Sequence, residues 1–327
     1  MLVFLESPSR DPYFNLAMEE YLFTRYRGER EFFLLWQNDN TVVVGKHQNT
    51  AEEINAEAVQ KLGVRVARRL SGGGAVYHDT GNLNYTFITE GGQEAEFDFR
   101  IFADPVVEAL SRFDVPAEFN GRNDLTIRGL KFCGNSQYAK QGRILHHGCI
   151  MLDSNLTVVS DVLRPKEAKF RSKSSKSVRS RVTTINQQAP SPITMEQFKQ
   201  VLLECVSTRQ EIEFGTLSPE DMAAIDRLQQ EKYETWEWNF GSSPAYDVRL
   251  EEKFPMGLVT AYLSVKQGCI RSVRFFGDFF GNEDLAQLER ELEGHRLDGS
   301  LERTLETIDV DRYMKGISAK ELCHLLR

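Results

Sequence analysis

The stretch that decides the fold of this chain is Arg68-Arg-Leu-Ser-Gly-Gly-Gly-Ala-Val-Tyr-His-Asp79. An apolar, β-branched run that includes Val64 and Val66 leads into it, which predicts that it follows a strand. Three consecutive glycines cost backbone entropy and are tolerated where the chain needs positive φ or where a ligand approaches the backbone. Their N–H groups can converge on an anion, and the two arginines add positive charge. The stretch therefore predicts a cradle for a phosphate or a carboxylate rather than a flexible turn.

Motif and composition exclude several classes of protein. No Gly-Lys-Ser/Thr follows the glycines and their spacing is not Gly-x-Gly-x-x-Gly, so neither familiar nucleotide-binding motif fits. The net charge of −8 argues against a basic nucleic-acid binder, and five scattered cysteines argue against a disulfide framework or a zinc site. The N-terminus is not typical of a signal peptide, and no apolar run approaches the ~20 residues that span a bilayer. We therefore expect a cytoplasmic protein without membrane or nucleic-acid partners.

The length of 327 residues, 41% of them hydrophobic, is enough for two domains. We predict a first domain over residues 1–241 and a smaller one over 245–327, with Ser242-Ser243-Pro244 as the linker. Hydrophobic periodicity predicts a helix from Pro12 whose Glu19, Glu20 and Arg25 face solvent. Further helices are expected over 51–62, 98–113, 194–207, 219–231, 284–293, 300–308 and 318–326. Strands are expected over 32–36, 41–45, 83–89, 149–152, 245–252, 256–267 and 269–277.

A lysine stands in an unusual position after the middle of the first domain. Residues 120–137 predict a turn, a strand, a tight turn and a second strand that carries Lys131. Gly134 lets the backbone come close to another group, and Asp124 offers a carboxylate to the ammonium. A compact cation of this kind suits the charge that develops when a carboxylic acid is activated as a mixed anhydride with AMP. Trp36, either core or pocket wall, could lie beside it.

Two other polar segments are candidates for function. His146-His147-Gly148 precedes the strand expected at 149–152, and we expect these histidines to form hydrogen bonds inside a site rather than to bind a metal. Residues 164–181 hold eight basic residues and one acidic residue, Glu167, together with five serines. This segment is either a solvated loop or a lid that meets a phosphate or an acidic partner.

Together these residues are similar to the lipoate–protein ligase A family, within the superfamily of lipoate and biotin ligases and octanoyltransferases. The resemblance covers essentially the whole chain and is strongest in five segments: residues 68–79, Gly121-Arg-Asn-Asp-Leu, Lys131-Phe-Cys-Gly-Asn-Ser, His146-His-Gly and Ser177-Val-Arg-Ser-Arg-Val-Thr. The glycine motif alone is shared with octanoyltransferases and, more loosely, with biotin ligases.

The resemblance implies an α/β (α+β) catalytic domain of the biotin and lipoate ligase type, with a central sheet flanked by helices, and a small C-terminal α+β accessory domain. It implies that free lipoate or octanoate and MgATP give an acyl-AMP and pyrophosphate. A lysine of an acceptor lipoyl domain then takes the acyl group. The implied role of the reaction is to scavenge free lipoate. The implied acceptors are E2 subunits of 2-oxoacid dehydrogenases and the glycine cleavage H protein, and we expect a monomer.

The resemblance also implies roles for individual residues. Lys131 is the implied catalytic residue and contacts both lipoate and the adenylate, with Asp124 and Gly134 supporting it. The residues implied to bind ATP and the adenylate are Arg69, Gly74, Ala75, Val76 and Tyr77. Those implied to bind lipoate are Trp36, Gly73, His78 and His147. The basic segment 164–181 matches one that closes over the adenylate, and no metal site is assigned beyond the Mg²⁺ that accompanies ATP.

Two alternatives remain open. The first is an ATP-independent octanoyltransferase or lipoyl amidotransferase. Some octanoyltransferases use a cysteine nucleophile upstream of the lysine, where this chain has Asn123-Asp124, so we expect Cys133 to be structural. The second is a non-catalytic module that grips RNA through the basic segment, although the aromatic-rich signatures of RNA-binding sheets are missing.

Overall fold

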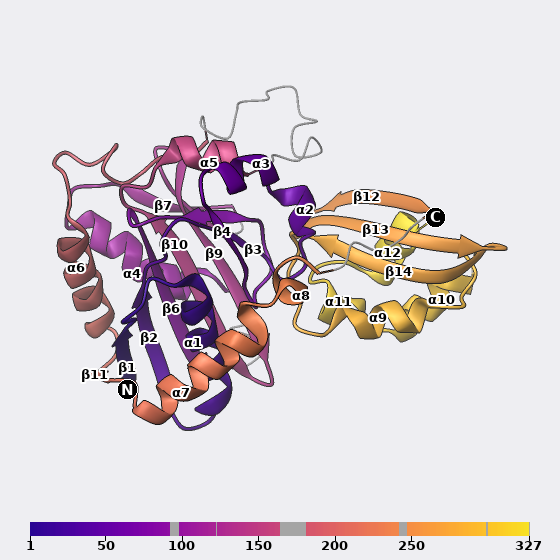
Figure 1. Ribbon diagram of the computed structural model, residues 1–327, viewed down its shortest axis with the longest axis horizontal. Helices are drawn as coiled ribbons and strands as arrows, with labels where there is room; N and C mark the ends of the chain where they lie inside the picture. The colour runs from indigo at the N-terminus through magenta and orange to yellow at the C-terminus, as the bar shows by residue number, and fades with distance from the viewer. Residues whose placement is uncertain (92–97, 122, 164–180, 242–246, 299, 327) are drawn as a thin grey trace.

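The computed structural model describes residues 1–91, 98–121, 123–163, 181–241, 247–298 and 300–326. Two bodies lie side by side, with the C-terminal part of the chain forming the smaller one (Figure 1). Residues 242–246, where we predict the domain boundary, lie outside the described residues. Among the helices that are described, none has the length and apolar character needed to cross a membrane.

The larger body is built on an eight-stranded mixed sheet. In spatial order its strands are β11 (Ile212–Phe214), β1 (Leu2–Glu6), β2 (Glu31–Trp36), β6 (Asn82–Glu90), β10 (Arg143–Met151), β9 (Leu130–Lys140), β8 (Asp124–Ile127) and β7 (Ala117–Asn120). β1 pairs in parallel with β11 and β2, whereas the other neighbours are antiparallel. This confirms the expected central sheet and adds β1, β7 and β11, which the sequence patterns did not indicate.

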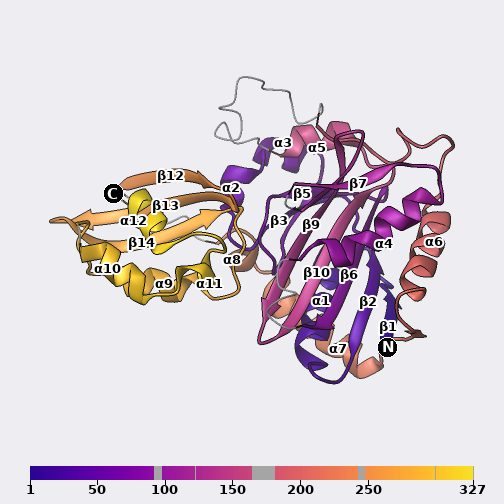
Figure 2. The same ribbon diagram turned by 180° about the vertical axis from the view of Figure 1, so that it is seen from behind.

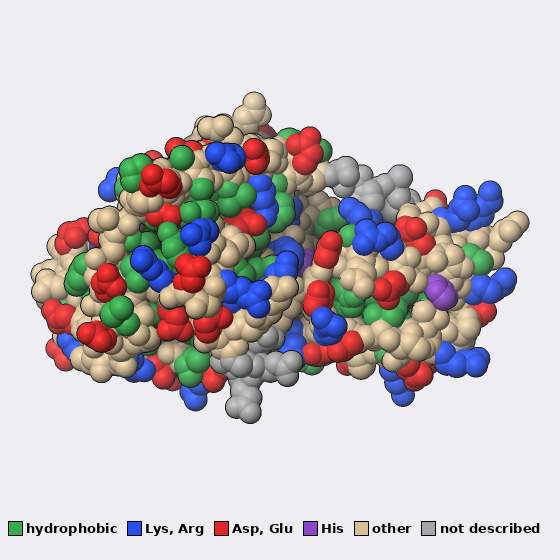
Figure 3. All heavy atoms as spheres, turned by 90° about the horizontal axis from the view of Figure 1, so that it is seen from below, with side chains coloured by type: hydrophobic (Ala, Val, Ile, Leu, Met, Phe, Trp, Pro, Cys, Tyr) green, Lys and Arg blue, Asp and Glu red, His purple; other side chains and the backbone are tan. Residues whose placement is uncertain are grey.

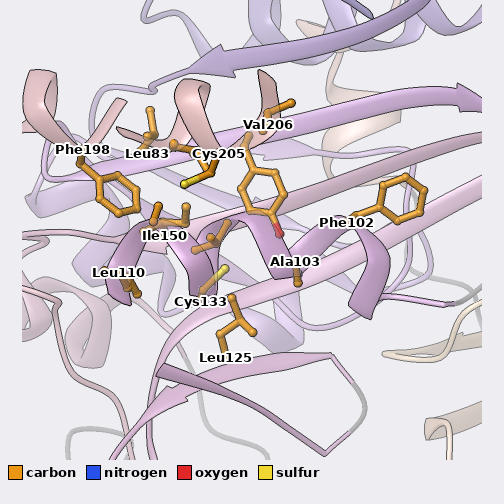
Figure 4. Close-up of a cluster of buried hydrophobic side chains, with 14 of the residues drawn as sticks. Leu83, Phe102, Ala103, Leu110, Leu125, Cys133, Ile150, Phe198, Cys205 and Val206 are labelled. Carbon is orange, nitrogen blue, oxygen red and sulfur yellow. The ribbon is translucent and has the colours of Figure 1, made fainter. Parts of the chain in front are cut away.

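Helices cover both faces of this sheet. One face packs against α4 (Arg100–Ser111) and α6 (Met195–Ser207), and the other against α1 (Pro12–Arg25), α7 (Pro219–Leu228) and the π-helix η4 (Gln229–Tyr233) (Figures 1 and 2). Strands buried on both sides are apolar throughout, so β2 sends Phe33 to the first core and Leu34 to the second. Figure 4 shows the first core, where Cys133 lies among the apolar side chains of the sheet and of both helices. Cys133 is therefore a core residue, as expected.

A second, three-stranded sheet carries the glycine stretch. Its order is β4 (Arg65–Arg68), β3 (Thr41–Val44), β5 (Val76–His78), and residues 69–75 connect β4 to β5. Three short helices accompany it: α2 (Thr50–Glu53), α3 (Ala56–Lys61) and α5 (Leu156–Val162). The single helix predicted over 51–62 is wrong, because Ile54 turns into the core of this sheet and forms a β-bridge with Leu163.

The smaller body has its own core. Its antiparallel sheet is formed by β12 (Val248–Phe254), β13 (Gly257–Lys266) and β14 (Cys269–Gly277). Its helices are α9 (Leu285–Leu292), α10 (Ser300–Thr307), α11 (Val310–Tyr313) and α12 (Ala319–Leu326), and α8 (Trp236–Asn239) lies between the two bodies (Figure 1). The expected accessory domain with a small antiparallel sheet is thus confirmed.

Two further predictions from the sequence are wrong in ways that matter for the site. Glu19 was expected to face solvent but is 2% exposed, because α1 is covered by the sheet on one side and by α7 and η4 on the other. His146 and His147 do not precede a strand but lie inside one, since β10 begins at Arg143. Both corrections move polar side chains from the surface or a loop into the interior.

Candidate functional site

A cavity lies where the small sheet meets the large one. Ten of the residues predicted for a site line it: Trp36, Arg69, Gly73, Gly74, Ala75, Val76, His78, Lys131, Gly134 and His147. They come from β2, the glycine stretch with β5, β9 and β10. The fold therefore joins segments that are up to about a hundred positions apart in the sequence.

The glycine stretch is wrapped around the guanidinium of Arg69. This group donates to the carbonyl oxygens of Gly72 (2.6 Å) and Gly74 (2.9 Å), to that of Val43 (3.2 Å), and to Ser71 Oγ (3.0 Å). Burial lowers the pKa of Arg69 to about 10, so it remains a cation at neutral pH. Gly73 adopts φ +83°, a conformation that favours glycine. Arg69 thus sets the shape of the stretch from within.

Arg68 points away from the cavity, toward the junction between the two domains. Its guanidinium donates to the carbonyl oxygens of Gly45 (2.8 Å), Gln48 (2.7 Å) and Trp238 (2.8 Å), and to Thr50 Oγ1 (2.6 Å). The prediction that both arginines add charge to a bound anion is therefore wrong for Arg68, because its side chain does not line the cavity as Arg69 does.

Adjacent glycines in the stretch lack side chains for different reasons. A Cβ on Gly72 would lie 2.3 Å from the carbonyl oxygen of Phe279, which belongs to the accessory domain. Gly73 lines the cavity, and a Cβ there would lie 3.1 Å from Arg69 Nη2. Gly72 therefore permits the domains to pack, whereas Gly73 forms part of the cavity wall.

Lys131 lies on the opposite wall and makes the predicted contact with Asp124. The distance between Lys131 Nζ and Asp124 Oδ1 is 2.7 Å, and the two side chains are 34% and 36% exposed. A Cβ on Gly134 would lie 2.8 Å from Lys131 Nζ, so the missing side chain leaves room for the ammonium. The backbone of Lys131 also pairs with that of Arg181, the last residue of the basic segment, and of Thr183.

The remaining wall is largely apolar and includes the ring of His78. Trp36 is 3% exposed and belongs to the core beneath α1, yet it also lines the cavity, so both of the roles considered for it apply. His78 lies 6.0 Å from the Trp36 ring, and burial next to Arg69 lowers its pKa to about 3. Leu16 and Val43 complete this wall.

Tyr77 is placed differently from its neighbours in the motif. Its ring packs in the core of the small sheet with Val42 and Val44, and its hydroxyl donates to Asn40 Oδ1 (2.8 Å). Because successive side chains of a strand point to opposite faces, Val76 and His78 line the cavity and Tyr77 does not. Any contact of Tyr77 with a nucleotide is left to its backbone.

Several cavity residues were missed from the sequence. They are Leu16, Val43, Asn84, Asn123, Asn135, Ser136, Gly148 and Cys149. Asn84 is 1% exposed, and its Nδ2 has no hydrogen-bond partner among the described residues, so it is a donor available to a ligand. The available signal was a polar residue inside an otherwise apolar strand, at Asn84 on β6 and at Asn135-Ser136 on β9.

Residues 164–180, which include nearly all of the basic segment, lie outside the described residues. Within the described ranges, no group of three or more His, Cys, Asp or Glu side chains gathers as a metal site would require.

Comparison with known proteins decides the family. Residues 11–207 match the lipoyl protein ligase A/B catalytic domain, and residues 243–326 match the bacterial lipoate protein ligase C-terminus. The chain belongs to the lipoyl protein ligase A/B family. It is 41% identical over 317 residues to lipoate–protein ligase 1 of Staphylococcus aureus, an alignment that covers 97% of each chain. Family membership with both domains matched gives this chain lipoate–protein ligase activity.

Two solved structures of ligases share the fold of the catalytic domain. A bipartite ligase from Thermoplasma acidophilum, described with its E2 lipoyl domain, is 28% identical with a TM-score of 0.64, over 76% of this chain and 98% of that one. A lipoate–protein ligase A bound with ATP is 25% identical with a TM-score of 0.63, over 73% of this chain and 98% of that one.

Proposed function

We propose that this ligase activates free lipoate or octanoate with ATP, giving an acyl-AMP and pyrophosphate, and then transfers the acyl group to a lysine of an apo lipoyl domain. The observation that carries the proposal is that the glycine stretch and Lys131 line one cavity together with an apolar wall. A phosphate, a reacting carboxylate and an acyl chain each have a matching surface there. The ATP bound to one neighbour and the E2 lipoyl domain described with another support it.

Each wall has a distinct task in this proposal. The acyl chain lies against Trp36, with the imidazoles of His78 and His147 beside it, while Gly73 to Val76 approach the phosphates. Lys131 donates to the carbonyl and phosphate oxygens where negative charge grows as the anhydride forms and breaks. Arg69 acts on the nucleotide by shaping the glycine stretch. Mg²⁺ would accompany ATP and offset the negative charge of its phosphates, and none of the described residues is assigned to hold it.

The proposed acceptors are lipoyl domains of E2 subunits and the glycine cleavage H protein. An acceptor lysine must reach the acyl-AMP, and Lys131 is one-third exposed, so the cavity is open to solvent on that side. We further propose that the enzyme scavenges lipoate in the cytoplasm as a monomer.

The test is incubation with lipoate, MgATP and a panel of apo acceptor domains, read by intact mass. The expected result is a lipoyl adduct on the acceptor lysine and one AMP released per transfer. Absence of any ATP-dependent adduct, with acceptors that a known ligase modifies in parallel, would overturn the proposal.

The geometry does not favour the two alternatives. An octanoyltransferase of the cysteine-dependent kind needs a reactive thiolate, but burial raises the pKa of Cys149, which lines the cavity, to about 11, and that of Cys133 well above its ordinary value. Transfer from an octanoyl carrier protein without ATP is the discriminating reaction. For RNA, acidic and basic side chains are interspersed over both domains on the face in Figure 3, while nearly all of the basic segment on which this alternative depends lies outside the described residues.

A further inference from the structure

A chain of buried polar side chains connects the apolar wall of the cavity to the glycine stretch. Trp36 Nε1 donates to Thr86 Oγ1 (2.8 Å), which donates to Glu19 Oε1 (2.6 Å). His147 Nδ1 lies 3.0 Å from the same carboxylate oxygen, and His147 Nε2 lies 2.7 Å from Ser71 Oγ. Through Arg69 the chain reaches the carbonyl oxygens of Gly72 and Gly74.

The hydrogen bonds of this chain converge on Glu19 from both ends. Ser71 Oγ accepts from Arg69 Nε, so its proton is available to His147 Nε2. His147 Nδ1 then donates to Glu19, which also accepts from Thr86. The buried guanidinium of Arg69 is thereby joined to the buried carboxyl group of Glu19 through Ser71 and His147.

Ser71, His147 and Glu19 are linked in the order of a serine, histidine and carboxylate triad. The same geometry nevertheless excludes a reactive serine. Ser71 is 1% exposed and does not line the cavity, and the Arg69 guanidinium occupies its oxygen. The chain therefore fixes positions rather than attacking a substrate. What it fixes is the glycine stretch at one end and His147 with Trp36 at the other.

We propose that Glu19 is a positioning residue, which acts through His147 and Ser71 to hold the glycine stretch in register with the acyl wall. A ligand that packs against Trp36 and His147 then stabilises the same arrangement of the stretch that a phosphate requires. Lipoate and ATP therefore bind with positive coupling, and each increases the affinity of the enzyme for the other by the same factor. This inference rests on the proposed use of both substrates and adds how their sites communicate.

The experiment measures the dissociation constants of lipoate and of a non-hydrolysable ATP analogue by calorimetry, each alone and with the other at saturation. The wild type is expected to show coupling on the order of 5-fold or more, within the usual range for linked sites. Glu19→Gln and Ser71→Ala are expected to reduce the coupling factor to about one. Ser71→Ala tests the chain from its other end if Glu19→Gln fails to fold.

The matched control is Asp221→Asn, which alters a buried carboxylate outside the chain. Asp221 is 7% exposed and accepts from Tyr21 and Tyr26 on the far side of α1. It is expected to lower Tm and keep wild-type coupling. Wild-type coupling in both Glu19→Gln and Ser71→Ala would overturn this inference but not the proposed function. The same holds if the wild type binds both ligands without coupling. A wild type that binds neither ligand would overturn the proposed function as well.

Discussion

Two cationic parts of the molecule lie at or next to the cavity, and they use their charges in opposite ways. Arg68 and Arg69 are 7% and 6% exposed, and their guanidinium groups donate to backbone carbonyls and hydroxyls of the protein itself. Lys131 is one-third exposed and holds Asp124 at the cavity wall. The more conspicuous sequence signal, the arginine pair, is therefore scaffold, whereas the single lysine is placed to meet a substrate. Burial rather than the charge itself separates the two.

The strongest test of this comparison is the substitution Arg68→Met. Several buried carbonyls would lose their donor, so we expect the free energy of unfolding to fall by about 3–5 kcal/mol. The measurement is denaturant unfolding. The control is Arg65→Met on the same strand, whose one-third-exposed ion pair with Asp11 contributes less than about 1 kcal/mol. Equal losses in the two variants would show that Arg68 is not scaffold.

Lys131→Ala tests the other side of the comparison. We expect an unchanged fold and a rate of acyl-AMP formation reduced by on the order of 10²–10³, because a donor to developing charge is lost. The assay is lipoate-dependent exchange of pyrophosphate into ATP, with Lys140→Ala at the exposed end of the same strand as the control. Wild-type exchange in Lys131→Ala would contradict its assignment.

Gly73→Ala separates strain from ligand contact. A positive φ costs an alanine about 1–2 kcal/mol, so Tm should fall slightly. Gly63→Ala carries the same type of strain at φ +60° with nothing within 4 Å of its Cβ. We expect similar losses of Tm in both, but weakened binding of ATP and lipoate in Gly73→Ala alone. Normal binding of both substrates by Gly73→Ala would remove this glycine from the proposed cradle.

The smallest effect concerns His78, the neutral neighbour of Arg69. Its pKa is about 3 in the folded protein and near 6.5 when unfolded, so the unfolded state binds more protons between these values and stability falls as pH decreases below 6.5. His78 should contribute a loss of about 1.4 kcal/mol between pH 7.5 and 5.5. His78→Gln should reduce the pH dependence of unfolding by that amount. Identical pH profiles would show that His78 titrates normally.

The sequence predicted the small antiparallel sheet and most helices from apolar periodicity, which is a local signal, whereas the central sheet and the roles of most cavity residues came from the resemblance to the ligase family. It missed Glu19 because a carboxylate is rarely buried without a partner, and its partner His147 is 128 positions away. It missed the break near Ile54 because that residue turns inward to meet Leu163, a contact between distant segments. The sequence also did not show which of Arg68 and Arg69 points toward the cavity. Adjacent residues of an extended chain point to opposite sides, but which side faces the cavity depends on how the chain packs.

The contact between Gly72 and the accessory domain has a consequence for modularity. His47 stacks on Phe279 at 4.9 Å, the Gly277 N–H donates to the His47 carbonyl, and Phe280 packs near Gly73. One side of the glycine stretch is thus formed by residues two hundred positions downstream. A catalytic domain separated at the junction would lose part of the enclosure of its own binding loop. The two halves are distinct in sequence and in core, but physically they share the loop, so neither is an interchangeable part.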